Sequence, residues 1–458
     1  MPAHRSTRRP RPQQGGGRRS RLSDASGKTP KTQDVLAPGD YEVIDLGRAG
    51  DGIAVPLSPD SASAGRKVVI PFTVPSDRVR IAEQGSTAEI LVPSPDRAVP
   101  VCKLFGTCGG CRLQHVSTER LLTWKTALVT RALQQAGFTS LPKAEATAIP
   151  PATRRRADLA LRRTHDGIIL GLHQRNGLPL NLTECHVLHP DIMALLPHLR
   201  HSIQQLEGFG SSGDLMISLT DTGADLLLAT DRALSSSDRI RLARLAEAHQ
   251  IARISWRPKG SHETPETALQ REAPKLSFNG PAVALPPGAF LQASREGEAA
   301  IRNAIIAALP RSPGRRAQIT ELYAGCGSFT FTLAEHARVE AFEGSAPAIA
   351  ALSRAAGGLR ISAQQRDLNR QPVTGASLSN AFAVVLDPPH MGAGAQMRPL
   401  VAAKPPVVIY VSCNPQALER DASQLHAAGY TVTSVTVIDQ FAWSAETETV
   451  VRFDAPGR

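Results

Sequence analysis

The run that most constrains the fold of this chain is Val407 to Val411, five consecutive apolar residues that lead into Ser412-Cys413-Asn414-Pro415. A short, uninterrupted apolar run rich in β-branched residues is typical of a strand buried on both faces of a parallel sheet. Pro415 ends the run, because proline has no N–H for the ladder and disfavours a helical backbone at Asn414. Ligands of open α/β sheets bind at the carboxyl ends of strands. Cys413 is therefore a candidate functional residue, although a small buried cysteine that only fills space fits the same position.

The pattern over residues 288–458 extends this strand into a sheet. The sequence predicts a helix over 296–308, and a strand, a glycine turn and the start of a helix over 317–330. It also predicts strands over 339–343 and 381–387, each ending in a carboxylate. Alternating strands and helices of this kind indicate a parallel, doubly wound α/β domain.

Further regions precede this domain, since 458 residues exceed what one core organises. Residues 1–35 form a basic tail. Short alternating strands separated by Gly, Pro and Ser predict a small closed β-barrel over 36–100. Residues 101–287 predict an α+β domain, with a helix at 119–138 that can pack on the C-terminal domain. The polar stretch 257–275 is expected to be a solvated loop.

The positive charge of the chain is concentrated at its start. Residues 1–31 hold seven arginines and two lysines against Asp24, a net +8 in a chain of +11. An arm rich in Arg and Gly predicts RNA as a partner, and a tail that is only solvated is the alternative. No apolar run approaches the ~18 residues of a membrane span, and residues 1–33 contain no apolar signal segment. Six cysteines are too few for a disulfide scaffold, which indicates a reducing compartment, so we expect a cytoplasmic protein. We also expect a monomer without a membrane partner.

Four cysteines predict a metal centre. Cys102, Cys108 and Cys111 fall within ten residues in a glycine-rich loop, and Cys185 follows at a distance. Four thiolates suit either zinc or an iron–sulfur cluster. Zinc sites more often pair two C-x-x-C units, and only one is present. The spacing therefore favours a 4Fe–4S cluster.

A glycine turn predicts a nucleotide-like cofactor. Glu321 to Gly327 resembles the G-x-G turn of class I S-adenosylmethionine enzymes, and the missing third glycine disfavours a pyrophosphate cradle. Glu343 closes the next strand, 16 residues after Gly327, where it is placed to accept both ribose hydroxyls. Asp367 follows a further short strand and could face the adenine. S-adenosylmethionine is the cofactor that these residues predict.

Together these motifs resemble, over about residues 40–458, the bacterial iron–sulfur RNA 5-methyluridine methyltransferases that modify 23S ribosomal RNA. The resemblance is carried by the four cysteines, by Ser412 to Pro415 and by Glu446 to Val451. It implies an N-terminal TRAM-like (OB-like) RNA-binding barrel, a central RNA-binding domain with the cluster, and a Rossmann-like class I methyltransferase domain. It implies a pocket for S-adenosylmethionine and uracil formed by Gln292, Tyr323, Ser328, Glu343, Asp367 and Asp387.

By the same resemblance Cys413 is the nucleophile and Glu448 the base. A thiolate added to carbon 6 of uracil gives an enolate whose carbon 5 can take a methyl group, and a base then removes the carbon 5 proton. Several residues depart from the family pattern. His390 stands where arginine usually follows Asp387-Pro-Pro, and Glu446 stands where histidine is common. Ser328 and Ser294 stand where asparagine is common, and the aromatic residue usual before the arginine run is missing at Ala152-Thr153.

Other functions remain open at this point. Within the same reaction, the alternative substrate is the T-loop uridine of transfer RNA. A non-catalytic iron–sulfur RNA-binding protein that has kept the fold is an alternative of another class. A cytosine C5-methyltransferase fits less well, because those enzymes place their nucleophile in a Thr-Cys context.

Overall fold

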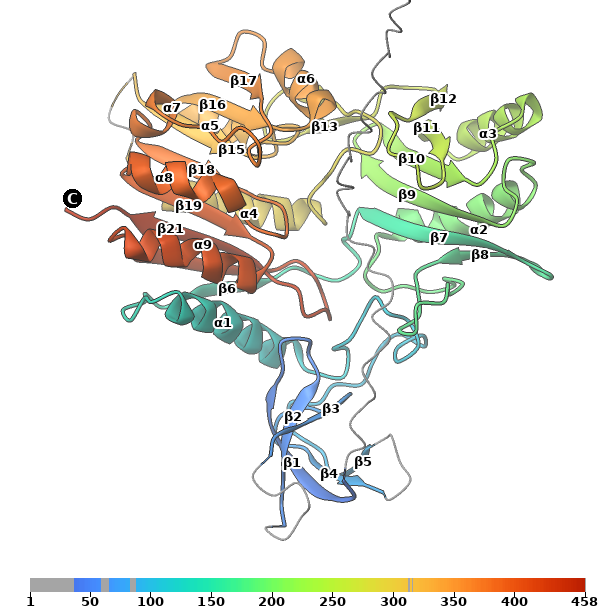
Figure 1. Cartoon of the computed structure of the whole chain (residues 1–458). Helices are drawn as coiled ribbons and strands as arrows, with labels where there is room; N and C mark the ends of the chain where they lie inside the picture. The colour runs from blue at the N-terminus through green and yellow to red at the C-terminus, as the bar shows by residue number, and fades with distance from the viewer. Residues whose placement is uncertain (1–36, 59–65, 83–87, 312–313, 315, 458) are drawn as a thin grey trace, which may run out of the picture. The chain divides into compact units, whose positions relative to one another are not determined.

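Strands of three larger sheets and one two-stranded ribbon make up the β structure of the protein, seen in a computed structural model that describes residues 37–58, 66–82, 88–311, 314 and 316–457. The described residues cluster as one unit (Figure 1). The predicted basic tail lies outside them. No helix of the described part of the chain is both long and apolar enough to cross a membrane.

The C-terminal sheet has eight strands in the order β17-β16-β15-β18-β19-β21-β20-β6. The first five are parallel, which confirms the predicted doubly wound sheet, and β21 runs antiparallel between β19 and β20. β6 joins the far edge from a part of the chain that precedes the other seven strands. The strands are β6 (Glu145–Ala148), β15 (Gln318–Leu322), β16 (Arg338–Glu343), β17 (Ile361–Gln365), β18 (Ala383–Leu386), β19 (Val407–Ser412), β20 (Thr431–Asp439) and β21 (Glu448–Asp454).

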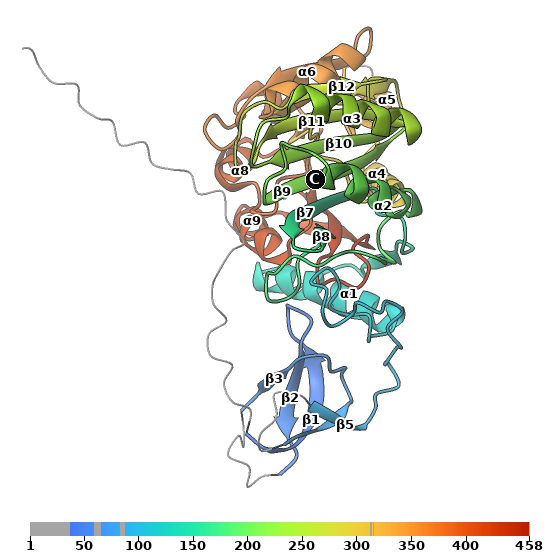
Figure 2. The same ribbon diagram turned by 90° about the vertical axis from the view of Figure 1, so that its right-hand side faces the viewer.

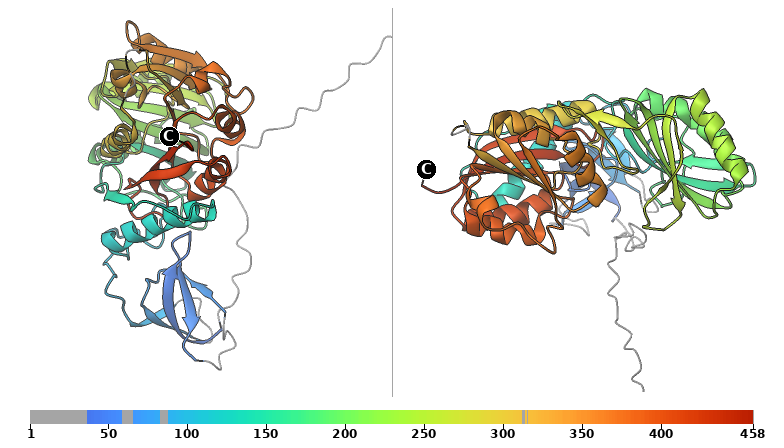
Figure 3. Two further views of the ribbon diagram at one scale, coloured as in Figure 1. Left: turned by 90° about the vertical axis from the view of Figure 1, so that its left-hand side faces the viewer. Right: turned by 90° about the horizontal axis from the view of Figure 1, so that it is seen from above.

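Alternation along β19 gives this sheet two apolar cores. Val407, Ile409 and Val411 point into one core, and Val408 and Tyr410 point into the other. The helices of the first core are α4 (Arg295–Ala308), α5 (Thr330–His336) and α6 (Ala346–Ala355). The helices of the second are α1 (Thr118–Gln135), α7 (Ala376–Ser379), α8 (Met397–Ala403), which follows the 3-10 helix η1 (Gly394–Gln396), and α9 (Pro415–Ala427). The sheet is therefore covered on both faces (Figure 3).

A second sheet, of six strands in the order β12-β11-β10-β9-β7-β8, packs one face against α2 (Pro190–Gln204) and α3 (Ser236–Ala248) (Figure 2). The expectation of a loop over 257–275 is wrong, because β12 pairs there with β11 as an edge strand. Edge strands tolerate polar sequence, and this hides them from pattern analysis. The strands are β7 (Arg156–Thr164), β8 (Gly167–Gly171), β9 (Ser212–Thr220), β10 (Gly223–Thr230), β11 (Ile251–Pro258) and β12 (Glu266–Gln270).

The N-terminal sheet is antiparallel, in the order β3-β2-β1-β4-β5. Among the described residues, β3 pairs only with β2 and β5 only with β4, so closure into a barrel stays a prediction. Its strands are β1 (Gly39–Leu46), β2 (Gly52–Pro56), β3 (Val68–Ile70), β4 (Arg78–Ile81) and β5 (Ala88–Val92). The two-stranded ribbon consists of β13 (Lys275–Ser277) and β14 (Ala282–Ala284).

Candidate active site and cysteine cavity

Three predicted residues meet at the carboxyl edge of the parallel strands. Asp387 directly follows β18 and Cys413 directly follows β19, and these strands are parallel neighbours. The antiparallel register of β19 and β21 pairs Ser412 with Thr449, which places Glu448 beside Cys413. The fold therefore gathers a thiol and two carboxyl groups at the edge where open α/β sheets bind ligands.

Two buried amides link the carboxyl groups. Gln292 Nε2 donates to Asp387 Oδ2 at 3.1 Å, and Gln440 Nε2 donates to Gln292 Oε1 at 3.1 Å and to Glu448 Oε2 at 2.9 Å. The guanidinium of Arg155 donates to the backbone oxygen of Gln292 at 3.2 Å. Gln440 Oε1 is buried and has no partner among the described residues. Gln440 was missed by the sequence analysis, and its place directly after a strand was the available signal.

The environment opposes ionisation of all three groups. Burial raises the pKa of Asp387 to about 7, and burial together with the charge of Asp387 raises the pKa of Glu448 well above its ordinary value. Burial, followed by the charges of Glu448, Asp387 and Glu446, raises the pKa of the Cys413 thiol to about 12. A cation brought into this site would favour both the thiolate and the carboxylates.

Two of the departures from the family pattern, His390 and Glu446, lie side by side at this site. His390 Nε2 is 4.0 Å from Glu446 Oε2, and both side chains are more than half exposed. The Asn414 amide donates to the backbone oxygen of His390 at 2.9 Å, next to Cys413. Glu446 and His390 therefore sit at the solvent-facing rim rather than within the buried network.

The glycine turn is tied to Glu343 by backbone hydrogen bonds. Gly325 N–H donates to Glu343 Oε2 at 2.9 Å, and Ser345 N–H donates to Glu343 Oε1 at 2.7 Å. Gly325 and Gly327 have φ of +57° and +99°. A Cβ on Gly327 would lie 2.7 Å from Leu352 Cδ1, whereas a Cβ on Gly325 would have no atom within 4 Å. Gly327 is required by packing, and Gly325 borders open space.

The remaining predicted pocket residues are arranged separately around this turn. Tyr323 has φ of +65°, and its hydroxyl donates to the Ala393 oxygen at 3.0 Å. Ser328 is partly buried within the turn. Asp367 is exposed after β17 and accepts the Asn369 N–H at 3.0 Å in its own turn. Burial, and then the charges of Asp421, Asp367 and Glu343, raise the pKa of Tyr323.

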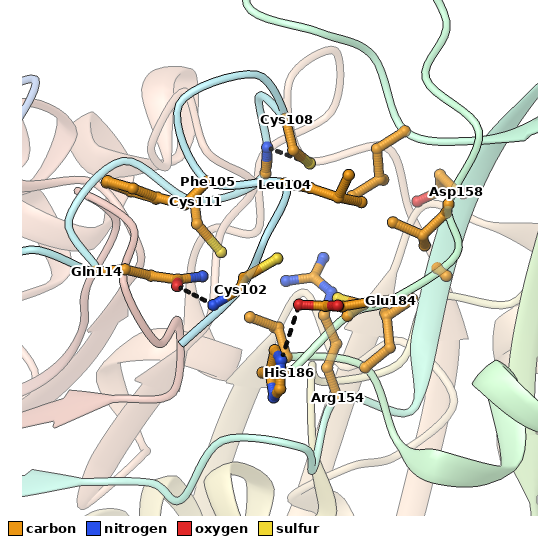
Figure 4. Close-up of a pocket in the computed structure, with 17 residues that line it drawn as sticks. Cys102, Leu104, Phe105, Cys108, Cys111, Gln114, Arg154, Asp158, Glu184 and His186 are labelled. Carbon is orange, nitrogen blue, oxygen red and sulfur yellow. Dashed lines mark hydrogen bonds and ion pairs between the residues drawn. The ribbon is translucent and has the colours of Figure 1, made fainter. Parts of the chain in front are cut away.

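A separate cavity of about 210 Å³ is lined by all four predicted metal ligands, Cys102, Cys108, Cys111 and Cys185. Figure 4 labels the first three of them. The four are free cysteines. A Cβ on Gly109 would lie 2.9 Å from the His173 oxygen, so glycine lets the loop approach closely. Burial raises the pKa of Cys111 to about 11 and also raises the pKa of Cys102 and of Cys185.

The donor chemistry of this cavity fits an iron–sulfur group, since four thiols share one enclosure. Across the described ranges, no set of three or more His, Cys, Asp or Glu side chains is already arranged to hold a metal ion. A bound metal would have to displace the thiol protons, because burial favours the neutral form. The 4Fe–4S cluster therefore stays a prediction.

Proteins of similar sequence include RNA methyltransferases. Residues 360–455 match the family described as "tRNA (Uracil-5-)-methyltransferase". An "Uncharacterized RNA methyltransferase" of Caulobacter vibrioides is 37% identical, over 90% of this chain and 98% of the relative. The "23S rRNA (uracil(1939)-C(5))-methyltransferase RlmD" of Halomonas elongata is 31% identical, over 91% of this chain and 90% of the relative.

The fold has a solved counterpart. The Pyrococcus abyssi tRNA (uracil-54, C5)-methyltransferase, solved with S-adenosyl-L-homocysteine, superposes with a TM-score of 0.67 at 20% identity. The match covers 91% of this chain and all of that one. This likeness establishes the Rossmann-like methyltransferase fold. With relatives above 30% identity over nearly the whole length, the chain belongs to the family of S-adenosylmethionine-dependent RNA (uracil-5-)-methyltransferases.

Proposed function

We propose that this chain transfers a methyl group from S-adenosylmethionine to carbon 5 of a uridine in 23S ribosomal RNA, through a covalent bond between Cys413 and carbon 6. The observation that carries the proposal is the meeting of Cys413, Asp387 and Glu448 at one edge of the sheet, where the carboxyl ends of β18 and β19 lie beside the amino end of β21. Membership of the family supports the reaction type.

Each residue has a role in this scheme. The Cys413 thiol gives its proton to solvent and the thiolate sulfur bonds carbon 6, which moves an electron pair of the ring onto oxygen 4. Carbon 5 then takes the methyl carbon, and the sulfonium sulfur keeps the bonding pair. Glu448 removes the carbon 5 proton, the ring double bond re-forms and the Cys413 thiolate leaves. Gln292 and Gln440 hold the two carboxyl groups in place.

S-adenosylmethionine, when bound, supplies the methyl group and a positive charge that favours the thiolate. We assign the ribose hydroxyls to Glu343, because that carboxyl group already accepts hydrogen bonds at the glycine turn. Tyr323, Ser328 and Asp367 complete the proposed cofactor pocket. The target uridine must leave its stack to reach Cys413, so a flipped base or a single-stranded loop is the substrate.

The remaining regions serve binding in this proposal. The four cysteines would hold a 4Fe–4S cluster, supported by their common cavity and donor type. Residues 36–100 would form a TRAM-like barrel, 101–287 a central RNA-binding domain and 288–458 the catalytic domain, with the basic tail as a further RNA contact. The protein would act as a cytoplasmic monomer.

The choice of RNA is supported by one comparison. The Halomonas elongata relative named for 23S rRNA is 31% identical, whereas the Pyrococcus abyssi enzyme named for tRNA supports only the fold at 20%. The tRNA T-loop uridine is therefore the second candidate. Mapping 5-methyluridine in total RNA from cells with and without this gene tests both. Loss of one 23S rRNA site supports the proposal, loss of a tRNA site moves the substrate, and RNA binding with an unchanged map favours a non-catalytic protein.

A further inference from the structure

A fully buried lysine lies beside the active site but outside it. The Lys125 side chain, on α1, is 0% exposed, and its Nζ donates to Asp439 Oδ1 at 2.5 Å and to the Phe441 oxygen at 3.1 Å. Lysine is almost never fully buried unless it is paired. Such a pair adds little net stability, because desolvation offsets the attraction between the charges. What it does fix is the position of the groups that it joins.

The two residues that Lys125 contacts, Asp439 and Phe441, flank Gln440 in the sequence. Asp439 Oδ1 also accepts the Phe441 N–H at 3.2 Å, so the ion pair holds the backbone on both sides of Gln440. The Gln440 amide then reaches Gln292 at 3.1 Å and Glu448 at 2.9 Å. A shift of this backbone would therefore move the side-chain amide of Gln440, the only one among the described residues that bridges Gln292 and Glu448.

The same loop is held at a second point by the chain that precedes α1. Arg112 N–H and Leu113 N–H donate to the Trp443 oxygen at 2.9 and 3.0 Å. Trp443 has φ of +57°, a conformation that costs a non-glycine residue energy and persists only when its surroundings impose it. The segment 112–125 therefore contacts the loop between β20 and β21 at two points, Phe441 and Trp443.

We infer that Lys125 is a positioning residue of the active site: with Asp439 it fixes the backbone around Gln440, and so sets the amide that joins Gln292 to Glu448. Its effect on catalysis rests on the proposed function, whereas its effect on the loop does not. The contact joins residues 314 positions apart, which gives α1 a role in the site.

Hydrogen exchange tests the positioning without any substrate. In Lys125→Met, the backbone amides of residues 439–447 should exchange at least about tenfold faster, because opening of this loop no longer has to break the contacts of Lys125 with Asp439 and Phe441. Arg253→Met is the matched control, since Arg253 forms a buried pair with Asp225 at 2.7 Å in the six-stranded sheet. That variant should loosen β10 and β11 and leave 439–447 unchanged.

The pH dependence of methyl transfer tests the consequence. Donation from Gln440 lowers the pKa of Glu448, so a displaced amide should move the acidic limb of the kcat profile to higher pH. Lys125→Met and Gln440→Leu should shift the acidic limb to higher pH by similar amounts, and the double variant should shift the limb no further. Lys125→Arg should bring the limb most of the way back to its position in the unmodified protein. Arg253→Met should lower the melting temperature without moving the limb.

The outcomes separate the two proposals. Unchanged exchange over 439–447 in Lys125→Met, or an acidic limb that moves equally in Arg253→Met, overturns the positioning role. If Lys125→Met does not fold, hydrogen exchange over 439–447 is compared between Lys125→Arg and Asp439→Asn. Faster exchange in Asp439→Asn than in Lys125→Arg supports the positioning role, and slow exchange in Asp439→Asn counts against it. If the unmodified protein methylates no RNA, the proposed function fails, and the exchange result still decides whether Lys125 positions the loop.

Discussion

The proposed active-site edge, where Cys413, Asp387 and Glu448 meet, and the cysteine cavity both contain thiols, but their side chains are held in place in different ways. Cys413 and Asp387 directly follow strands and Glu448 begins one, and buried amides link Asp387 to Glu448 through Gln292 and Gln440. The cavity cysteines lie outside the named helices and strands. A site for covalent catalysis needs its geometry before the substrate arrives. A cavity that receives a metal can leave part of its geometry to the metal.

The largest effect should come from the thiol of the active-site edge. Cys413→Ala should bind S-adenosylmethionine and RNA but neither methylate the RNA nor form an adduct, because nothing attacks carbon 6. Methyl incorporation and denaturing gels measure this. Retained activity would end the covalent scheme and, with it, the view that this edge is preorganised for attack.

Removing the base should interrupt the reaction later. Glu448→Gln leaves attack and methyl transfer in place but slows proton removal by about 10²–10⁴-fold, the usual contribution of a general base. A covalent protein–RNA adduct should then accumulate and survive denaturation. The double variant with Cys413→Ala is the control and should show none. Normal turnover would assign the base to another carboxyl group, with Glu446 next.

The proposed cluster in the cysteine cavity can be tested at Cys185, which is far from the other three cysteines in the sequence. Protein purified without oxygen should be brown with about four irons per chain, and Cys185→Ser should lose most of the iron and much of the stability. Cys326→Ser is the matched control, because Cys326 is buried in the glycine turn, outside the cavity. Stoichiometric zinc in a colourless protein would contradict the cluster.

Burial of Asp387 at the proposed active-site edge should also make the stability of the folded protein depend on pH. The pKa of Asp387 is raised to about 7 by burial, and an unfolded Asp titrates near 3.9. Between about pH 4 and 7 the unfolded chain releases a proton that the folded chain keeps, so stability falls as pH rises, by at most about 1.4 kcal/mol per pH unit. Asp387→Asn should flatten this fall and raise the melting temperature at pH 8. An equal gain at pH 4 would point to a cause other than titration.

The smallest effect on the fold should come from the tail. Deleting residues 1–31 removes a net charge of +8, so RNA affinity should fall and its dependence on salt should flatten. The melting temperature and the iron content should stay unchanged. An identical salt slope in the truncated protein would show that this segment, outside the described residues, is not an RNA contact.

The sequence by itself determined the elements that follow from local rules. An apolar run predicted β19, Pro415 marked its end, and the glycines predicted the turn at Gly325 and Gly327, where φ is positive. The spacing of cysteines identified the four residues that line one cavity. Short-range sterics and side-chain periodicity set these features, so a neighbouring stretch of chain is enough to read them.

Only the tertiary structure decided which distant residues meet. Gln440 gives no signal beyond its place after a strand, β6 joins a sheet formed almost entirely by residues after 317, and Lys125 pairs with Asp439 across 314 positions. The sequence analysis missed β12 for a related reason, because β12 is a strand through its pairing with β11 and its own sequence has no strand pattern. Strand order and register set such contacts, and they depend on the packing of the whole chain rather than on any one segment.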